Sequence, residues 1–191
     1  MYLGGSATDV ARELLLDKAF GFMKKTRMDK LLLVKYSAYP FKDFFKGLEK
    51  NEAVRRIFGE KTEEVLSNLK VEFTKLGGYM FVNDRNGHLV INVDYLNSGN
   101  KTDIYLDVIH ELVHIRQFSE GKELFDHNYT YAERPTEIEA YQFVVEEARR
   151  MGLSDERICL YLKTEWMTDE DLRRLTKAVG VECREKKKHP S

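Results

Sequence analysis

Two histidines four residues apart, His110 and His114, place the strongest constraint on how this chain can fold. They bound the segment His110-Glu111-Leu112-Val113-His114, a His-Glu-x-x-His pattern within a stretch that predicts an α-helix from about Thr102 to Ser119. Residues four apart share one helical face, so both imidazoles project the same way. Two neutral imidazoles on one face form half of a tetrahedral zinc site. Glu111 follows the first histidine, at the position where a carboxylate can reach a metal-activated water.

The alternative is a surface helix that carries two solvated histidines. Apolar residues around the motif argue against it, because they recur at helical spacing and cover most sides of the helix. These residues are Ile104, Tyr105, Val108, Ile109, Leu112, Val113 and Ile115. A helix that is apolar on most sides is buried, and two histidines on a buried helix need partners. A metal ion would supply them.

A zinc site built on two histidines needs a third protein ligand. The downstream candidates are His127, Glu133, Glu137 and Glu139. Helical periodicity favours Glu137. The residues that share its helical face are mostly apolar, which predicts that this face points inward: Ala140, Tyr141, Val144 and Ala148. The stripe of Glu139 is polar and predicts a solvent face: Gln142, Glu146 and Arg150. A buried carboxylate requires a partner, whereas a solvated one does not. The alternative for Glu137 is a helix N-terminal carboxylate that the macrodipole favours.

The remaining pattern predicts an α+β fold in one domain. We expect a helical N-terminal part over 1–70, a catalytic core over 71–152, and C-terminal helices with a tail over 153–191. The first part includes a helix from about Thr8 to Lys25, a strand at Lys30–Tyr36 and helical segments between residues 41 and 70. Alternating apolar residues and an Asn-Gly turn predict a small antiparallel sheet between residues 71 and 96. Helices follow up to about Gly180.

Composition excludes several classes of protein. The formal charge is -1, and a nucleic-acid-binding surface normally carries a clear basic excess, so we expect no nucleic acid partner. No apolar run reaches the length of a membrane span, and the N-terminal residues lack the basic and apolar regions of a secretory signal, so we expect neither a membrane span nor a signal. The two cysteines, Cys159 and Cys183, do not form a disulfide framework, so free thiols in a reducing cytoplasm are expected. The basic run 184–189 predicts a solvated tail. The oligomeric state is left open.

The metal motif and Glu137-Ile138-Glu139-Ala140 on a second helix together resemble the gluzincin metallopeptidases. The similarity is nearest to their minimal forms, including the ImmA/IrrE-like group, and covers about Val71 to Met151. It implies a zincin-like fold in which a small antiparallel sheet packs on the metal helix and the glutamate helix, with extra N- and C-terminal helices. It also implies Zn²⁺ held by His110, His114 and Glu137, and a peptide or protein substrate bound along an edge strand at about Leu89–Tyr95.

One position departs from that pattern. Thermolysin-type members carry an aspartate four residues after the ligand glutamate, and it orients a zinc-bound histidine. This chain has Tyr141 there. A different residue must then support the site, and Asp107, one turn before His110, is a candidate.

The predicted reaction is hydrolysis of a peptide bond by a metal-activated water with Glu111 as general base. A second electrophile usually stabilises the oxyanion, and His127, Tyr129 and Tyr131 are candidates, although aromatic packing explains them equally well. Two histidines and a carboxylate also suit divalent ions other than zinc. The alternative function is a non-catalytic or latent zinc-binding module with a regulatory or structural role. A DNA-binding helix-turn-helix over 154–180 is disfavoured by its acidic residues.

Overall fold

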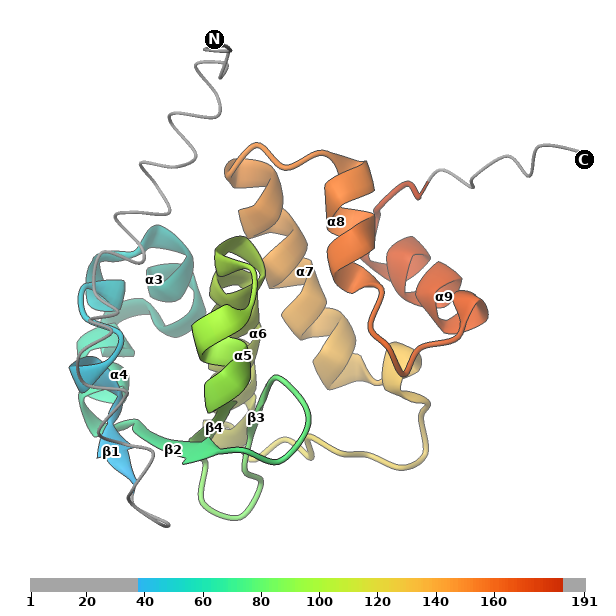
Figure 1. The fold of residues 1–191 in the computed structure, drawn as a ribbon. Helices are drawn as coiled ribbons and strands as arrows, with labels where there is room; N and C mark the ends of the chain where they lie inside the picture. Colours follow the sequence, from blue (N-terminus) through green and yellow to red (C-terminus); the bar gives the residue numbers. More distant parts are fainter. Residues whose placement is uncertain (1–37, 184–191) are drawn as a thin grey trace, which may run out of the picture. The chain divides into compact units, whose positions relative to one another are not determined.

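The computed structural model describes residues 38–183 and confirms the α+β class (Figure 1). The chain divides into two compact units, Met1–Leu124 and Phe125–Ser191. The helix predicted at Thr8–Lys25, the strand predicted at Lys30–Tyr36 and the basic tail lie outside the described residues.

The first unit contains a four-stranded sheet in the order β1-β2-β4-β3. Its strands are β1 (Tyr39–Pro40), β2 (Lys70–Thr74), β3 (Met80–Val82) and β4 (Leu89–Asn92). The β3–β4 pair is antiparallel, as expected, and β1, a strand that the sequence did not indicate, is antiparallel to β2, but β2 and β4 pair in parallel. The sheet is therefore mixed, because the chain passes through β3 at the edge before it returns as β4 beside β2.

The predicted alternation of strand residues from Leu89 to Tyr95 is correct only as far as Asn92. There the side chain Oδ1 accepts hydrogen bonds from the backbone N–H groups of Asp94, at 2.8 Å, and Tyr95, at 3.0 Å. Asn92 thus caps helix α5 (Val93–Ser98), and the strand ends. Since β4 lies between β2 and β3, it is not an edge strand, and the edge on this side of the sheet is β3.

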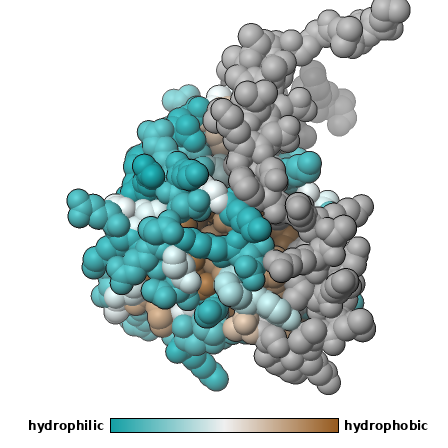
Figure 2. All heavy atoms as spheres, turned by 90° about the vertical axis from the view of Figure 1, so that its left-hand side faces the viewer, coloured by the Kyte–Doolittle hydropathy of each residue, from teal (hydrophilic) through white to brown (hydrophobic). Residues whose placement is uncertain are grey.

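Two short helices lie between β1 and β2 in the first unit. Helix α3 (Glu52–Phe58) is capped by Asn51, and α4 covers Thr62–Asn68, close to the predicted segments. The helix predicted at Phe41–Lys50 is instead split into the 3-10 turns η1 (Phe41–Asp43) and η2 (Leu48–Lys50), with a third, η3 (Gly59–Lys61), after α3. Gly47 has φ 83°, a left-handed conformation that interrupts the helix. Hydrophilic side chains predominate on the face where α3 and α4 lie (Figure 2).

Among the described residues of the first unit, the longest helix is α6 (Lys101–Ser119). Asn100 caps it by accepting hydrogen bonds from the N–H groups of Thr102 and Asp103, and its contacts within the unit include α3 and β3. Gly87 in the turn before β4 allows a close approach to this helix, because a Cβ there would lie 2.5 Å from the Phe118 ring. The core around it is apolar and fully buried: Val71, Leu89, Ile91, Leu106, Ile109 and Leu112.

The second unit is helical. It contains η4 (Tyr131–Glu133), α7 (Pro135–Arg150), α8 (Asp155–Leu162) and α9 (Asp169–Val179). Pro135 occupies the first turn of α7, Ser154 caps α8, and Thr168 forms a capping box with Asp171, all as the sequence predicts. Helix α8 ends at Leu162, whereas the sequence pattern favours a helix from Ser154 to Trp166. Among the helices of residues 38–183, none combines the length and apolar character needed to cross a membrane.

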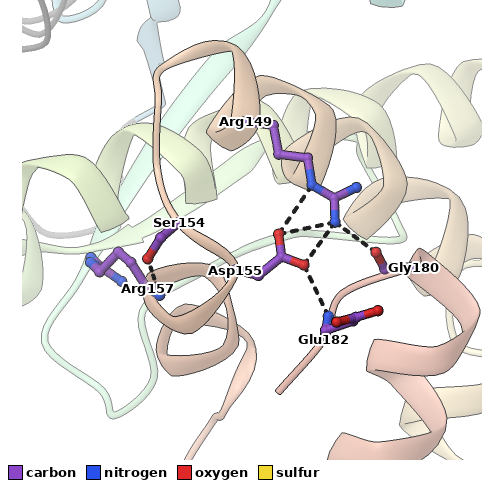
Figure 3. A network of polar contacts seen from close by, with 6 residues as sticks. All are labelled: Arg149, Ser154, Asp155, Arg157, Gly180 and Glu182. Carbon is purple, nitrogen blue, oxygen red and sulfur yellow. Dashed lines mark hydrogen bonds and ion pairs between the residues drawn. The ribbon is translucent and has the colours of Figure 1, made fainter. Parts of the chain in front are cut away.

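The prediction of free thiols is wrong, because Cys159 and Cys183 form a disulfide with a Cα–Cα distance of 5.6 Å. Gly180 has φ 69° and ends α9 in the left-handed conformation, which turns the chain back toward α8. Asp155 then accepts a hydrogen bond from the Glu182 N–H, and Arg149 donates to both Asp155 and the Gly180 carbonyl (Figure 3). Disulfides form in oxidising compartments and also occur inside hyperthermophilic cells, so the cytoplasmic location stays a prediction.

Candidate metal centre

His110 and His114 lie in the middle of α6 and are both 6% exposed. One helical turn separates them, and their rings meet edge to face with centroids 4.6 Å apart. The two Nε2 atoms are 2.9 Å apart. The helix therefore directs one ring nitrogen from each histidine to the same point, as the motif predicts.

This geometry fits a metal ion with a small adjustment. Zinc–nitrogen bonds of 2.0–2.1 Å at a tetrahedral angle separate two ligand nitrogens by about 3.4 Å. The observed 2.9 Å between the Nε2 atoms of His110 and His114 is shorter by about half an ångström. Small rotations of the two side chains remove that difference, because both nitrogens already converge.

Gln117 fixes the tautomer of the second histidine. Nδ1 of His114 lies 2.7 Å from the Gln117 side-chain oxygen, and Gln117 is fully buried, at 0% exposed. An amide oxygen only accepts hydrogen bonds, so Nδ1 of His114 is the donor and its Nε2 keeps the lone pair that a metal requires. Sequence reasoning missed this residue. The available signal was its spacing, three residues after a ligand histidine, on a helix that is otherwise apolar.

Glu111 is 7% exposed and is part of the buried stretch of α6. The helix fixes its position relative to His110, because the two residues are adjacent in the middle of a regular 19-residue helix. A carboxylate is rarely buried to this extent unless its surroundings give it partners. Glu111 is therefore not a solvated surface carboxylate.

Glu137 lies in the first turn of α7 and is 5% exposed. A negative charge is favoured at that end of a helix by the macrodipole. The Arg134 guanidinium, three residues earlier, places Nη1 at 3.8 Å from Oε1 of Glu137. Glu139 is more exposed than Glu137, which agrees with the inward stripe predicted for the latter.

Three side chains form a group that can hold a metal ion: His110, His114 and Glu137. Each offers one ligand atom, and these atoms all lie within 4.8 Å of one another. The structure thus brings together the three residues that the sequence singled out as ligands. Two imidazole nitrogens and one carboxylate oxygen suit zinc and other divalent transition metals. These ligand atoms could hold a metal ion, and they do not identify which metal it is.

Other residues that the sequence offered as ligands or as oxyanion stabilisers are exposed. His127 is exposed, and Glu133 is exposed and forms an ion pair with Arg174 at 3.1 Å. Tyr129 is 46% exposed in the segment before α7. His127 and Glu133 are not part of the group that can hold a metal ion.

Tyr141 occupies the position at which thermolysin-type proteins have an aspartate. It is buried, and its hydroxyl lies 2.9 Å from that of Tyr131. The Tyr131 ring in turn contacts Trp166 edge to face, with centroids 6.1 Å apart. Tyr141 is therefore held by an aromatic cluster of its own unit.

Asp107, the predicted support for a ligand histidine, accepts a hydrogen bond from the Tyr95 hydroxyl. Burial raises the pKa of Tyr95 well above its ordinary value, and the charge of Asp107 raises it further. Tyr95 is therefore a phenol that donates to Asp107 throughout the physiological range. That Asp107 orients His110 stays a prediction.

Comparisons with known proteins do not assign the chain to a family. No protein-family model, no curated protein and no solved structure matches the chain. A function can therefore be inferred only from the residues of the candidate metal centre.

Proposed function

We propose that the protein is a metal-dependent peptidase, with zinc as the metal, of the gluzincin type. The observation that carries the proposal is the buried His110–His114 pair, with Glu137 completing a three-ligand group and Glu111 directly after the first histidine. A purely structural metal site is usually closed by a fourth protein ligand and has no use for an adjacent carboxylate. Three ligands and a neighbouring base are typical of a hydrolytic centre.

The roles of the residues follow from their chemistry. His110, His114 and Glu137 would hold the ion, and Gln117 keeps the His114 imidazole in the required tautomer. A bound divalent metal supplies Lewis acidity, which makes the attacking water more acidic and polarises the substrate carbonyl. Glu111 removes a proton from that water as its oxygen bonds to the carbonyl carbon. The same carboxyl group then gives the proton to the amine that leaves when the C–N bond breaks.

The edge strand β3 offers a place for an extended substrate. It pairs with β4 on one side only, and within the first unit it contacts α6, the helix that carries the histidine pair. Phe81 in this strand is 47% exposed. An extended peptide can add to such an edge through main-chain hydrogen bonds, and side-chain pockets then supply selectivity. This strand replaces Leu89–Tyr95 as the expected substrate edge.

A metal analysis combined with a peptidase assay tests the proposal. Purified protein is expected to contain about one equivalent of zinc and to cleave members of a peptide library. A chelator should abolish cleavage and added Zn²⁺ should restore it. The matched control is Glu111→Gln, which should retain the metal without activity. Zinc binding with no cleavage of any peptide would instead favour the non-catalytic zinc module, and absence of metal binding would refute both.

A further inference from the structure

Arg134 has an unusual environment for a basic residue. Its side chain is only 12% exposed. Two aromatic rings lie beside the guanidinium, with centroids 5.9 Å from Cζ for Phe125 and 6.0 Å for Tyr131. Rings at this distance attract the cation and restrict its movement. Arg134 is therefore a largely buried and positioned charge.

The hydrogen-bonding capacity of this guanidinium is mostly unused. It has five N–H donors. Within the described part of the chain, its one hydrogen bond runs from Nε to the Asp126 carbonyl at 3.3 Å. The nearest carboxylate, that of Glu137, is 3.8 Å from Nη1, too far for a hydrogen bond. Several donors of a charged group thus remain for another acceptor.

The charge of Arg134 depends on what happens to Glu137 for its compensation. When Glu137 binds a metal ion, its negative charge is shared with the ion and compensates Arg134 less. The guanidinium then has only a weakened counter-ion beside the proposed catalytic centre. A planar guanidinium with two parallel donors matches a carboxylate, which it binds in a bidentate manner.

We propose that Arg134, flanked by Phe125 and Tyr131, is a substrate-binding residue that recognises a carboxylate of the peptide. The carboxylate is either the C-terminal one or that of an acidic side chain close to the cleaved bond. The neighbouring rings form the apolar wall that accompanies it. This role rests on the proposed peptidase function, whereas binding of the carboxylate itself does not.

Calorimetric titration of short peptides tests the proposal without requiring catalysis. The probes are N-acetyl-Ala-Ala and its C-terminal amide, and N-acetyl-Ala-Glu-amide with its Gln counterpart, each titrated into zinc-free and zinc-loaded protein. One of the two acidic probes should bind at least about tenfold more tightly than its neutral partner. Which acidic probe shows the preference identifies the source of the carboxylate. Trp166, the single tryptophan in the chain, contacts Tyr131, so its fluorescence should respond to the same ligand.

Variants of Arg134 separate recognition from a structural role. Arg134→Gln should reduce the acid preference to about one, and Arg134→Lys, which keeps the charge but not the planar pair of donors, should leave a smaller preference than wild type. Both should keep their zinc. Arg173→Gln, the same charge change at an exposed site on α9, should behave as wild type.

The results overturn the proposal in two ways. Equal binding of acidic and neutral probes to wild type removes the carboxylate site. Loss of zinc from Arg134→Lys and Arg134→Gln, with the acid preference unchanged, would make Arg134 a support for Glu137 instead. The peptidase proposal fails on a different result. If acid-selective binding depends on Arg134 but the protein cleaves no peptide, the carboxylate-binding site is supported and the peptidase function is refuted.

Discussion

The side-chain oxygen of Gln117 accepts a hydrogen bond from Nδ1 of His114 at 2.7 Å, and both side chains are buried on α6. The contact leaves Nε2 of His114 as an acceptor and holds the plane of the imidazole. Residues that orient a ligand histidine in this way typically change metal affinity by 10- to 100-fold when they are replaced. Gln117 is therefore part of the candidate metal centre, although it offers no ligand atom.

Gln117→Leu should weaken zinc binding by about 10- to 100-fold, because the imidazole of His114 loses its orienting acceptor. Competition against a zinc chelator measures the change. Gln117→Glu provides the matched control, since a carboxylate accepts the same hydrogen bond and should restore most of the affinity. Wild-type affinity in Gln117→Leu would show that packing alone positions His114.

Glu111→Gln should abolish hydrolysis and leave the metal in place. The amide is nearly isosteric with the carboxylate but cannot accept the proton of the attacking water, and loss of a general base costs about 10²-fold or more in rate. The measurement is cleavage by metal-replete protein, with metal content determined on the same sample. Full activity in that sample would remove Glu111 from the mechanism.

The local features of this fold could be predicted from the sequence. Asn51, Ser154 and Thr168 cap the helices that follow them, and Gly121, Gly152 and Gly180 take positive φ just after helices end. The register of α7 also followed from periodicity, because burial of an apolar stripe decides which glutamate points inward. Helix caps and hydrophobic periodicity depend on a few neighbouring residues, so they can be predicted from the sequence.

The non-local features could not be predicted. The parallel β2–β4 pairing and the Cys159–Cys183 bond join segments that only tertiary packing brings together. At Val93–Ser98 two local signals competed: alternation favoured a strand, and the capping side chain of Asn92 favoured the helix that forms. Gln117 escaped notice because a polar residue on a helix has no visible role until its partner is known.

Cys159→Ser should destabilise the second unit by about 3 kcal/mol, because the disulfide closes a loop between residues 24 apart in the sequence. Thermal unfolding with and without a reductant measures the effect. Cys183→Ser should give the same loss, and the reductant should affect wild type only. Two free thiols in non-reduced wild-type protein, counted by mass spectrometry after alkylation, would contradict the bond.

Asp155 should titrate below the ordinary aspartate value. The Glu182 N–H is the largest cause of the lowered pKa, and the Arg149 guanidinium lowers it further. Because the folded-state pKa is below the unfolded value of about 3.9, the carboxylate stabilises the fold above that pH, and the contribution is lost as pH falls through the folded-state pKa. Carboxyl NMR titration measures this directly, and the Glu182 amide resonance should shift in step. A pKa at or above the ordinary value would contradict the contact.

Glu137→Ala should weaken zinc binding far more than Glu139→Ala. Glu137 is 5% exposed and belongs to the group that can hold a metal ion, whereas Glu139 is more exposed and lies outside that group. Removing one of three protein ligands takes a negative charge from the site and leaves a weaker water in its place. Removing Glu139 should change stability by less than about 0.5 kcal/mol.

Competitive titration of both variants against a zinc chelator compares them, and circular dichroism confirms that both remain folded. The pair is closely matched, since both changes remove one glutamate from the first turns of α7. If Glu139→Ala released the metal and Glu137→Ala retained it, the ligand would be the other carboxylate. The register assigned to the inward face of α7 would then be wrong by two residues. Arg134 would also no longer lie beside a metal ligand. The His110–His114 pair would still hold the ion, because its geometry is set within α6 alone.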